Sequence, residues 1–447
     1  MKRNERLFSN IDLLRLFLPL IIEQFLELFV GLINSMMAAH VGEAAVSAVS
    51  LVEFVMALLI SLFVALATGG SVVIGQYMGM KKKITARRTA NQLVWFLGIV
   101  SVIITILIFL IRPLILNGIF GQITDEVREL ANSYLLIMLL SIPFVALYNA
   151  GAAIFRTMGN SKLPMMIMMV MNLINVIGIG ILLFVFKMGI IGIAIPTLFT
   201  RAAAGIIIIS LAMNKKYEIH IENKLKFKPN IIIIKKILDI GLPYGLENVL
   251  FYLGRIIVLS LVALYGTAAI AANAVSGTIV MFEVLPGIAI GLGLTTIISR
   301  CIGAKDYEQA KYYNKKIIII EYIAHFLSCS FVVLILPYLL KIYGLSTEAT
   351  NLTIKIVWWY TLFQITIWPL AYALPVTFRA SGDSKFPMIV GIISMFLCRI
   401  LLSYIFSKYT NMGMFGTWVA MFADWIVKAI IFVHRYFSGK WIKYLNK

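Results

Sequence analysis

The sequence predicts an all-α polytopic membrane protein with twelve transmembrane helices in two pseudo-symmetric six-helix lobes. Of its 447 residues, 61% are hydrophobic and only 13% are charged, which is more apolar surface than a water-soluble core can hide. In addition, the eleven residues at 155–165 recur at 378–388 with seven identical positions. A repeat at this separation indicates that one half-unit is present twice.

Each predicted helix is an apolar stretch of roughly 20 residues or more, the length that crosses a bilayer. In the first half these stretches are 13–37, 46–78, 90–112, 130–157, 164–186 and 190–213. In the second half they are 236–264, 271–301, 316–340, 351–379, 387–407 and 412–436. The first stretch is too long for a signal peptide and lacks a small-residue cleavage site, so we expect it to remain in the mature protein.

Orientation follows from the Lys and Arg residues that flank these helices. One side holds 29 of the 39 and the other holds 6, with four inside the helices. Cytoplasmic loops carry the excess of Lys and Arg, so both termini are expected in the cytoplasm. The protein is expected to be a multi-pass protein of the plasma membrane.

The landmarks of the two halves recur in the same order. Pro19 and Glu23 recur as Pro243 and Glu247, and Gly79 recurs as Gly303. Since six is an even number of crossings, the halves share one orientation, as in parallel-repeat transporters. The predicted lobes are residues 1–213 and 231–447, joined by a polar cytoplasmic linker at 214–230.

The repeated motif, Phe-Arg-x-x-Gly-x-Ser-Lys-x-Pro, falls at a cytoplasmic corner between two helices of each half. The Gly permits a tight turn, and Ser161 or Ser384 is expected to cap the next helix. Pro164 or Pro387 suits the first turn of that helix, and the Lys and Arg are expected near anionic headgroups. A structural corner is favoured over direct contact with a substrate.

Carboxylates in the first and seventh predicted helices are the leading functional candidates, because a carboxylate in hydrocarbon costs several kcal/mol unless it is paired, protonated or hydrated. Glu23 and Glu27 are one helical turn apart, with Asn34 two turns further along the same stripe. Two charges so close cannot both persist cheaply, so one is expected to exchange a proton or a cation. Glu247 repeats Glu23, and the preceding Pro19 and Pro243 permit a bend.

Three more acids lie within predicted helices: Glu53, Glu283 and Asp424. Arg201, Arg255, Arg399 and Lys428 are their possible partners. Asp424 and Lys428 are four residues apart, and we favour a pair that satisfies itself. Glu283 precedes Pro286 in a Gly-rich stretch that looks bendable. Both a structural partner for a buried cation and a pocket carboxylate stay open for it.

Polar and aromatic side chains of the fifth and tenth predicted helices are the candidates for lining a cavity. They are Asn172, Asn175, Gln364, Trp368 and Tyr372, with Glu53 and Asp424 from other helices. Aromatic faces attract cations, and the Met-rich start of the fifth helix could repack around varied ligands. For most Met and aromatic residues, ordinary packing or an interfacial belt is the favoured interpretation.

Other chemistries find little support. No GxxxxGK[ST] phosphate loop is present, and three cysteines without a CxxC pattern indicate neither a disulfide framework nor a metal site. The four histidines are scattered and are interpreted as loop or interface residues. The net charge of +19 is distributed in short clusters, which is typical of membrane topology rather than nucleic-acid binding. We expect no enzymatic activity, no cofactor and no metal beyond a possible Na+ site.

Together, the two six-helix halves, the Pro-x-x-x-Glu of helices one and seven, and the paired corner motifs resemble the multidrug and toxic compound extrusion (MATE) family. The Gly-x-Gly run before Arg300-Cys301-Ile302-Gly303 adds to the resemblance. The resemblance implies a secondary transporter that exports cationic, amphipathic small molecules by H+ or Na+ antiport with alternating access. A monomer that contacts membrane lipids is expected.

This chain departs from the family pattern at the coupling residues. Where much of the family has an Asp in helix one, this chain has Asn34, and the helix-five Asp is replaced by Ile179. The Glu that many members place in helix seven is Phe251 here. The prediction for ion coupling therefore moves to Glu23, Glu27 and Glu247. The alternative is a flippase for lipid-linked precursors, which a cationic cavity built on Arg201, Arg255 and Arg399 would favour.

Overall fold

The computed structural model describes residues 6–119, 123–222 and 228–443, and every regular element in these ranges is a helix. The long apolar sequences form long helices because a backbone in lipid must satisfy its own hydrogen bonds. The first group is α1 (Asn10–Ala39), α2 (Glu43–Gly79), α3 (Lys83–Leu114), α4 (Asp125–Thr157), α5 (Lys162–Gly180) and α6 (Ile191–Ala212). The second group is α7 (Ile231–Ala263), α8 (Gly266–Gly303), α9 (Tyr307–Tyr343), α10 (Thr347–Thr366), α11 (Trp368–Ala380), α12 (Lys385–Ser394), α13 (Leu402–Tyr409), α14 (Phe415–Phe437) and α15 (Lys440–Lys443).

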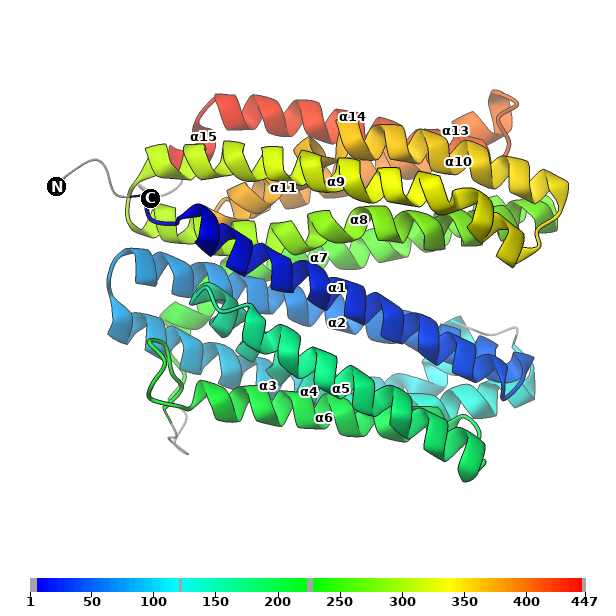
Figure 1. Cartoon of the computed structure of the whole chain (residues 1–447), viewed down its shortest axis with the longest axis horizontal. Helices are drawn as coiled ribbons and strands as arrows, with labels where there is room; N and C mark the ends of the chain where they lie inside the picture. Colours follow the sequence, from blue (N-terminus) through cyan, green and yellow to red (C-terminus); the bar gives the residue numbers. More distant parts are fainter. Residues whose placement is uncertain (1–5, 120–122, 223–227, 444–447) are drawn as a thin grey trace. The chain divides into compact units, whose positions relative to one another are not determined.

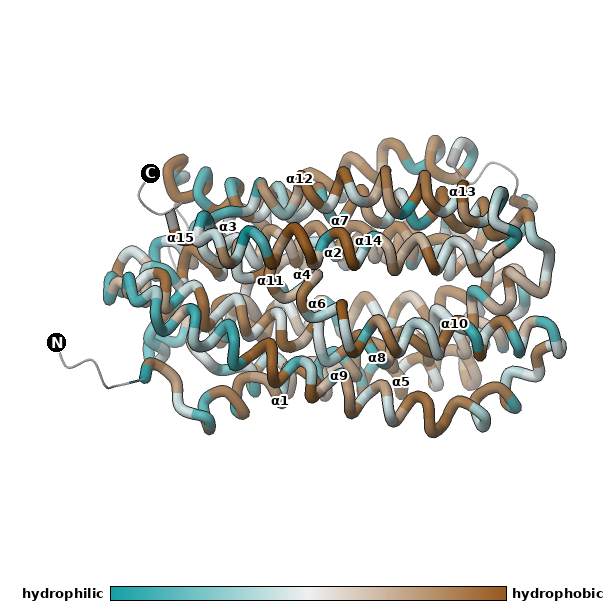
Figure 2. The backbone as a smooth tube through the Cα atoms, turned by 90° about the horizontal axis from the view of Figure 1, so that it is seen from above, coloured by the Kyte–Doolittle hydropathy of each residue, from teal (hydrophilic) through white to brown (hydrophobic). Residues whose placement is uncertain are grey.

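Short π-helical segments extend or join three of these helices: η1 (Ile115–Ile119), η2 (Ile181–Val185) and η3 (Met395–Leu401). Eleven helices among the described residues are long and apolar enough to cross a membrane, and α10 with α11 forms a twelfth, bent span. Figure 2 shows apolar residues along the length of these helices and polar residues mainly toward their ends. The predicted number of spans is confirmed.

The chain divides into two compact units, Ser9–Gly245 and Leu246–Lys447 together with Met1–Phe8. In the Ser9–Gly245 unit, α4 packs against α2, α3 and α6, and α1 packs against α5 (Figure 1). In the other unit, α8 packs against α9, α10 and α11, and α14 packs against α11 and α13. Buried aliphatic and aromatic side chains fill the centre of each unit.

The sequence repeat also appears in the backbone, where the same unusual conformations recur in both halves. Lys81 and Lys305 adopt positive φ angles of 59° and 56°, and Lys187 and Asn411 adopt 53° and 55°. L-residues rarely adopt this left-handed region, so its recurrence at equivalent turns reflects a shared geometry.

Each corner motif ends its helix with a left-handed glycine, as predicted. Gly159 has φ 85° and Gly382 has φ 96°. In both corners the residue after this glycine donates its N–H back to a carbonyl oxygen near the end of the preceding helix. Asn160 N–H donates to Phe155 O at 3.0 Å and Asp383 N–H to Phe378 O at 2.9 Å. These bonds satisfy carbonyls at the helix end.

The predicted serine caps are wrong. Ser161 and Ser384 are at the cap positions but make no side-chain cap hydrogen bond. Both residues already have helical backbone angles, which direct the hydroxyl away from the open N–H groups. In the first corner, Asn160 Oδ1 takes this role and accepts from Leu163 N–H at 3.3 Å.

The tenth span is broken, whereas the sequence predicts one continuous helix at 351–379. Helices α10 and α11 meet at Ile367 with a bend of 47°. Pro369 has no N–H to offer the carbonyl of Ile365, and its ring clashes with a straight helix at that position. By contrast, α1, α7 and α8 run on through Pro19, Pro243 and Pro286 without a break.

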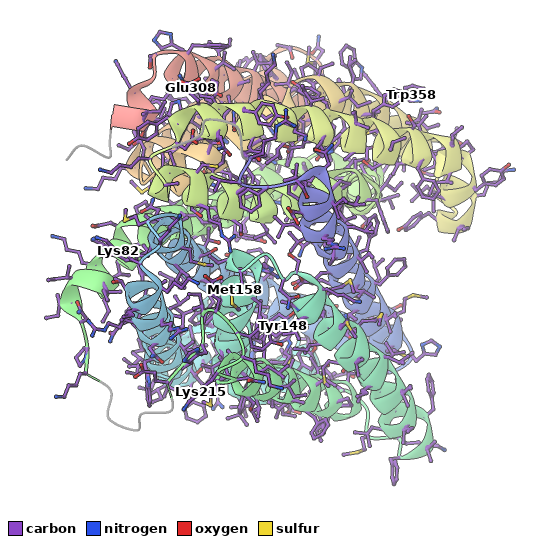
Figure 3. The ribbon with its side chains drawn as sticks, turned by 60° about the vertical axis from the view of Figure 1, so that its left-hand side comes forward. Lys82, Tyr148, Met158, Lys215, Glu308 and Trp358 are labelled. Atoms are coloured by element: carbon purple, nitrogen blue, oxygen red, sulfur yellow. The ribbon has the colours of Figure 1, made fainter. Side chains whose placement is uncertain are left out.

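The described part of the predicted linker, 214–222, packs onto the first corner. Ile219 N–H approaches Met158 Sδ at 3.4 Å, and the Tyr217 ring meets Phe155 edge-on. Figure 3 labels Met158 and Lys215 in this region. Residues 223–227 of the linker, and the cationic Lys2, Arg3 and Lys447, lie outside the described residues.

Candidate functional site

Glu23 in α1 forms a buried ion pair with the Arg of the first corner motif. Arg156 Nη2 donates to Glu23 Oε1 at 2.6 Å, and Glu23 is 2% exposed. Tyr148, labelled in Figure 3 inside the Ser9–Gly245 unit, places its hydroxyl 3.0 Å from the same oxygen. The guanidinium and phenol neutralise and solvate this carboxylate.

The repeat reproduces this pair in the other unit. Arg379 of the second corner donates through Nη2 to Glu247 Oε2 at 3.1 Å, and both side chains are at least four-fifths buried. Gly391 lies directly against the Glu247 carboxylate, where an added Cβ would come within 2.9 Å of Oε1. Each repeated Glu therefore ties the first helix of its half to its own corner.

These pairs correct one expectation and reveal a link between two features of the sequence. The motif arginines do not lie at anionic headgroups but inside their units, since side-chain exposure is 11% for Arg156 and 9% for Arg379. The corner motif and the carboxylates are also not separate features. Sequence analysis missed the pairing, although the Glu and the Arg recur together in both halves.

Glu27, one turn after Glu23, has a different environment. It is exposed and, among the described residues, makes no ion pair. The charges that act on it are those of Glu23, Arg156 and Arg201. Because Arg156 is already paired with Glu23, Glu27 is the carboxylate of these two without an ion pair of its own among the described residues.

Most of the other predicted polar residues of this unit have hydrogen-bond partners within the protein. Glu53 accepts from the Tyr134 hydroxyl at 3.0 Å, and Asn172 Nδ2 donates to the Leu26 carbonyl at 3.3 Å. Asn175 Oδ1 accepts from Thr197 at 3.2 Å. Asn34 is 4% exposed, and its Oδ1 has no hydrogen-bond partner among the described residues.

Glu283 in α8 is fully buried, and its partners come from α9 and α10. Thr361 Oγ1 donates to Oε1 at 2.8 Å, and Cys329 Sγ donates to Oε2 at 3.3 Å. No Lys or Arg pairs with it within the described ranges. Of the two roles predicted, the pocket carboxylate fits these neutral donors better than a partner of a buried cation.

His325 lies beside Glu283 and is fully buried, so its interpretation as a loop or interface residue is wrong. Its Nδ1 is 3.0 Å from the Glu283 carbonyl oxygen, and its Nε2 is 3.9 Å from Glu321 Oε1. Glu321 is only 1% exposed. The i,i+4 spacing of Glu321 and His325 in an apolar helix is the signal that could have revealed them.

The aromatic candidates form a connected stack in the same unit. Trp368 meets His325 edge-on at 4.8 Å and stacks on Tyr372 at 4.7 Å. Gln364 is buried and contacts His325, while Tyr372 lies beneath the Lys428 ammonium. Asp424 accepts from Lys428 at 2.9 Å, which confirms the predicted self-satisfied pair.

Two arginines of this unit, Arg255 and Arg399, carry like charges that act on each other. The guanidinium of Arg399, in η3, lies over the Phe251 ring at 4.9 Å and donates to Met421 Sδ at 3.2 Å. The like charge of Arg399 acts on Arg255, which is in α7. Within the described residues neither makes an ion pair.

Comparison with known proteins places these features in a family. The sequence model of the family described as MatE matches the chain twice, at residues 19–181 and 243–405, so that each match begins at the Pro preceding a paired Glu. The chain belongs to the MATE family of multidrug efflux transporters. The two matches coincide with the sequence repeat.

Relatives of this MATE chain align over nearly its whole length. It is 27% identical to the uncharacterized transporter YisQ of Bacillus subtilis, covering 95% of this chain and 93% of the relative. It is 23% identical to the probable multidrug resistance protein NorM of Thermotoga maritima, covering 97% and 93%. The multidrug export protein MepA of Staphylococcus aureus is 28% identical over 60% of this chain and 59% of its own.

Solved structures show the same fold. A crystal structure of MATE in the bent conformation superposes with a TM-score of 0.88 at 22% identity, covering 98% of this chain and 97% of that one. A MOP superfamily transporter from Pyrococcus furiosus, described as having a binding pocket of reverse polarity, gives 0.86 at 22% identity, covering 98% and 96%.

Proposed function

We propose that this MATE transporter exports amphipathic organic cations by secondary antiport, driven by inward flow of H+ or Na+. The observation that carries the proposal is Glu27, an exposed carboxylate on a membrane helix without an ion pair among the described residues. Such a carboxylate costs several kcal/mol in a membrane unless a proton or a cation accompanies it. It therefore suits an exchange of one cation for another.

The neighbouring pair supports this division of roles. Glu23 is matched by Arg156 and solvated by Tyr148, so its charge is balanced without a ligand. Binding of the coupling ion at Glu27 would cancel the charge that holds a cationic substrate. The substrate would then be released when the site faces outward. The descriptions of NorM and MepA as multidrug proteins support a cargo of this kind.

The test is efflux of a fluorescent organic cation from proteoliposomes with a proton or a sodium gradient imposed separately. We expect one of the two gradients to drive efflux. Glu27→Gln should lower the driven rate at least about tenfold, a change typical of coupling between two sites. Glu43→Gln, an exposed acid in the first turn of α2, is the matched control. If neither gradient moves any organic cation, antiport is wrong.

A second candidate, flipping of an anionic lipid-linked precursor, is favoured by Arg255 and Arg399. Two guanidinium groups without acids in a membrane unit suit phosphate or carboxylate oxygens, which arginine binds in bidentate geometry. Translocation of a labelled anionic lipid in the same vesicles, lost in Arg255→Gln with Arg399→Gln, would support this candidate over cation export.

The setting of this activity is part of the proposal. We expect a monomer in the plasma membrane, with both termini in the cytoplasm and lipids around the apolar helix faces. We expect the coupling ion to serve without any cofactor.

A further inference from the structure

A second titratable cluster lies inside the Leu246–Lys447 unit, apart from Glu27. It consists of Glu283 in α8, Glu321 and His325 in α9, and the donors Cys329 and Thr361. Glu283 and His325 are fully buried and Glu321 is 1% exposed. The proposed antiport assigns no role to Glu321 or His325.

The charges of this cluster do not balance by themselves. Glu283 and Glu321 would carry two negative charges, and no Lys or Arg within the described residues pairs with either. Two bare carboxylates cannot persist in so apolar an interior, and protons are the simplest neutralising ligand.

The hydrogen bonds identify where a proton is missing. His325 Nδ1 is 3.0 Å from the Glu283 carbonyl oxygen, which only accepts, and 3.2 Å from Gln364 Nε2. A hydrogen on Nδ1 satisfies the Glu283 carbonyl, and the Gln364 amide, whose Oε1 has no hydrogen-bond partner among the described residues, would then turn its oxygen toward Nδ1. The other nitrogen, Nε2, faces Glu321 Oε1 at 3.9 Å. Glu321 Oε2 and Gln364 Oε1 are buried without a hydrogen-bond partner in the described part of the chain. A proton on either Glu321 or Nε2 would bring the net charge of this dyad to zero.

The charged groups around the cluster of Glu283, Glu321 and His325 are compatible with a proton as the bound ligand. The charge of Glu321 acts on Tyr322 of α9, and the charges of Glu283 and Arg399 act on Tyr360 of α10. On α11 and α14, Lys428 donates to Asp424 and lies over the ring of Tyr372. Among the described residues no group of three His, Cys, Asp or Glu side chains has the arrangement to hold a metal ion.

The cluster also touches the break between α10 and α11. Tyr322 donates its hydroxyl to the Thr366 carbonyl at 3.1 Å, at the last residue of α10. Trp368, the first residue of α11, packs edge-on against His325. The Trp368 and His325 rings both contact Gly287, where any added Cβ would collide with them. A change of charge on His325 therefore acts directly on the first turn of α11.

We infer that Glu283, Glu321 and His325 form a proton-binding site of the Leu246–Lys447 unit, which controls the break between α10 and α11. The proton enters from water, binds at Glu321 beside His325 Nε2, and leaves from the same atoms. Its contribution to transport rests on the proposed antiport, whereas the binding of the proton does not.

The first experiment measures protonation in the full-length protein, reconstituted in lipid, by infrared difference spectroscopy across a pH titration. We expect carbonyl stretches of protonated carboxylic acids, one lost in Glu321→Gln and one lost in Glu283→Gln and shifted in Cys329→Ala, which removes a hydrogen bond to Glu283. Glu348→Gln and Cys398→Ala, outside the cluster, should leave both bands unchanged. A band that survives in Glu321→Gln, Glu283→Gln and the double variant would overturn the inference.

The second experiment measures the pH dependence of organic-cation efflux. Transfer of one coupled proton changes the driven equilibrium about tenfold per pH unit. We expect His325→Gln and Glu321→Gln to flatten this dependence, while His434→Gln keeps the wild-type profile. A dependence preserved in both cluster variants, or one that follows sodium at constant pH, would overturn the inference. Absence of any driven efflux in the wild type would instead refute the antiport, and the infrared result would still decide the site.

Discussion

At the residue scale, the same side chain has different roles according to its partner. Glu23 and Glu247 are held by the motif arginines, Glu27 is exposed without an ion pair in the described ranges, and Glu283 is solvated by a hydroxyl and a thiol. Matched charge favours a structural role, and unmatched charge favours a ligand. Spacing along the helices could not separate these cases.

We expect Glu23→Gln to destabilise the protein by roughly 3 to 5 kcal/mol, because Arg156 would remain buried without its carboxylate. Thermal unfolding in detergent would measure this loss. Glu27→Gln, one turn away, should leave the unfolding temperature unchanged.

A double variant tests the cause of that loss. Replacing Glu23 and Arg156 together with Leu removes both charges, and should recover much of the stability lost in Glu23→Gln. If the double variant is no more stable than Glu23→Gln, the ion pair does not explain the effect.

At the element scale, the broken tenth span is what distinguishes the second half from the first. Helix α4 occupies the equivalent position and remains continuous through Pro143. At Pro369 the freed carbonyls have an outside partner, since Tyr322 binds the Thr366 oxygen. A break in a membrane helix is tolerated only where neighbours satisfy the backbone in this way.

We expect Pro369→Ala to restore helical hydrogen bonding at the break and to straighten the span. The rate of organic-cation efflux should fall at least about tenfold if the bend is required for transport. Hydrogen exchange around Ile367 should slow in the same variant. Pro143→Ala in α4 is the matched control, and equal effects of the two changes would contradict a special role for the bend.

Close packing of α6 on α4 depends on Gly205. A Cβ added there would lie 2.5 Å from the backbone oxygen of Phe144, which cannot move aside. Small residues allow such close approach of membrane helices. We expect Gly205→Ala to cost about 1 to 3 kcal/mol through overpacking, as measured by thermal unfolding. Gly31→Ala, with no atom within 4 Å of the new Cβ, should be neutral.

At the scale of the whole molecule, duplication supplies the scaffold and departures from it supply the candidate chemistry. The Glu–Arg pairs, the left-handed turns and the corners recur in both halves. Glu27 corresponds to Phe251, and the break at Ile367 has no counterpart in α4. The candidate functional groups therefore lie where the halves differ.

The predicted topology can be checked with single cysteines at Lys82 and at Asn411, in a background lacking Cys301, Cys329 and Cys398. An impermeant maleimide should label Asn411→Cys from outside intact cells, and Lys82→Cys only in inverted vesicles. Labelling from the opposite sides would reverse the predicted orientation.

The sequence by itself determined the membrane class, the number of spans, the internal repeat and the glycine turns at both corners. These follow from composition and from local backbone requirements, which neighbouring residues along the chain express directly. It also correctly paired Asp424 with Lys428, because one helical turn separates them.

Only the tertiary structure decided the partners of the buried charges. Glu23 and Arg156 are 133 residues apart, and Glu283 meets Cys329 and Thr361 from two other helices. Which helix faces which cannot be read from periodicity, because lipid-facing and buried surfaces are both apolar here. The serine caps failed for a similar reason, since the backbone at Ser161 and Ser384 is already helical. Long-range packing thus determines which carboxylates are paired with a cation and which are not.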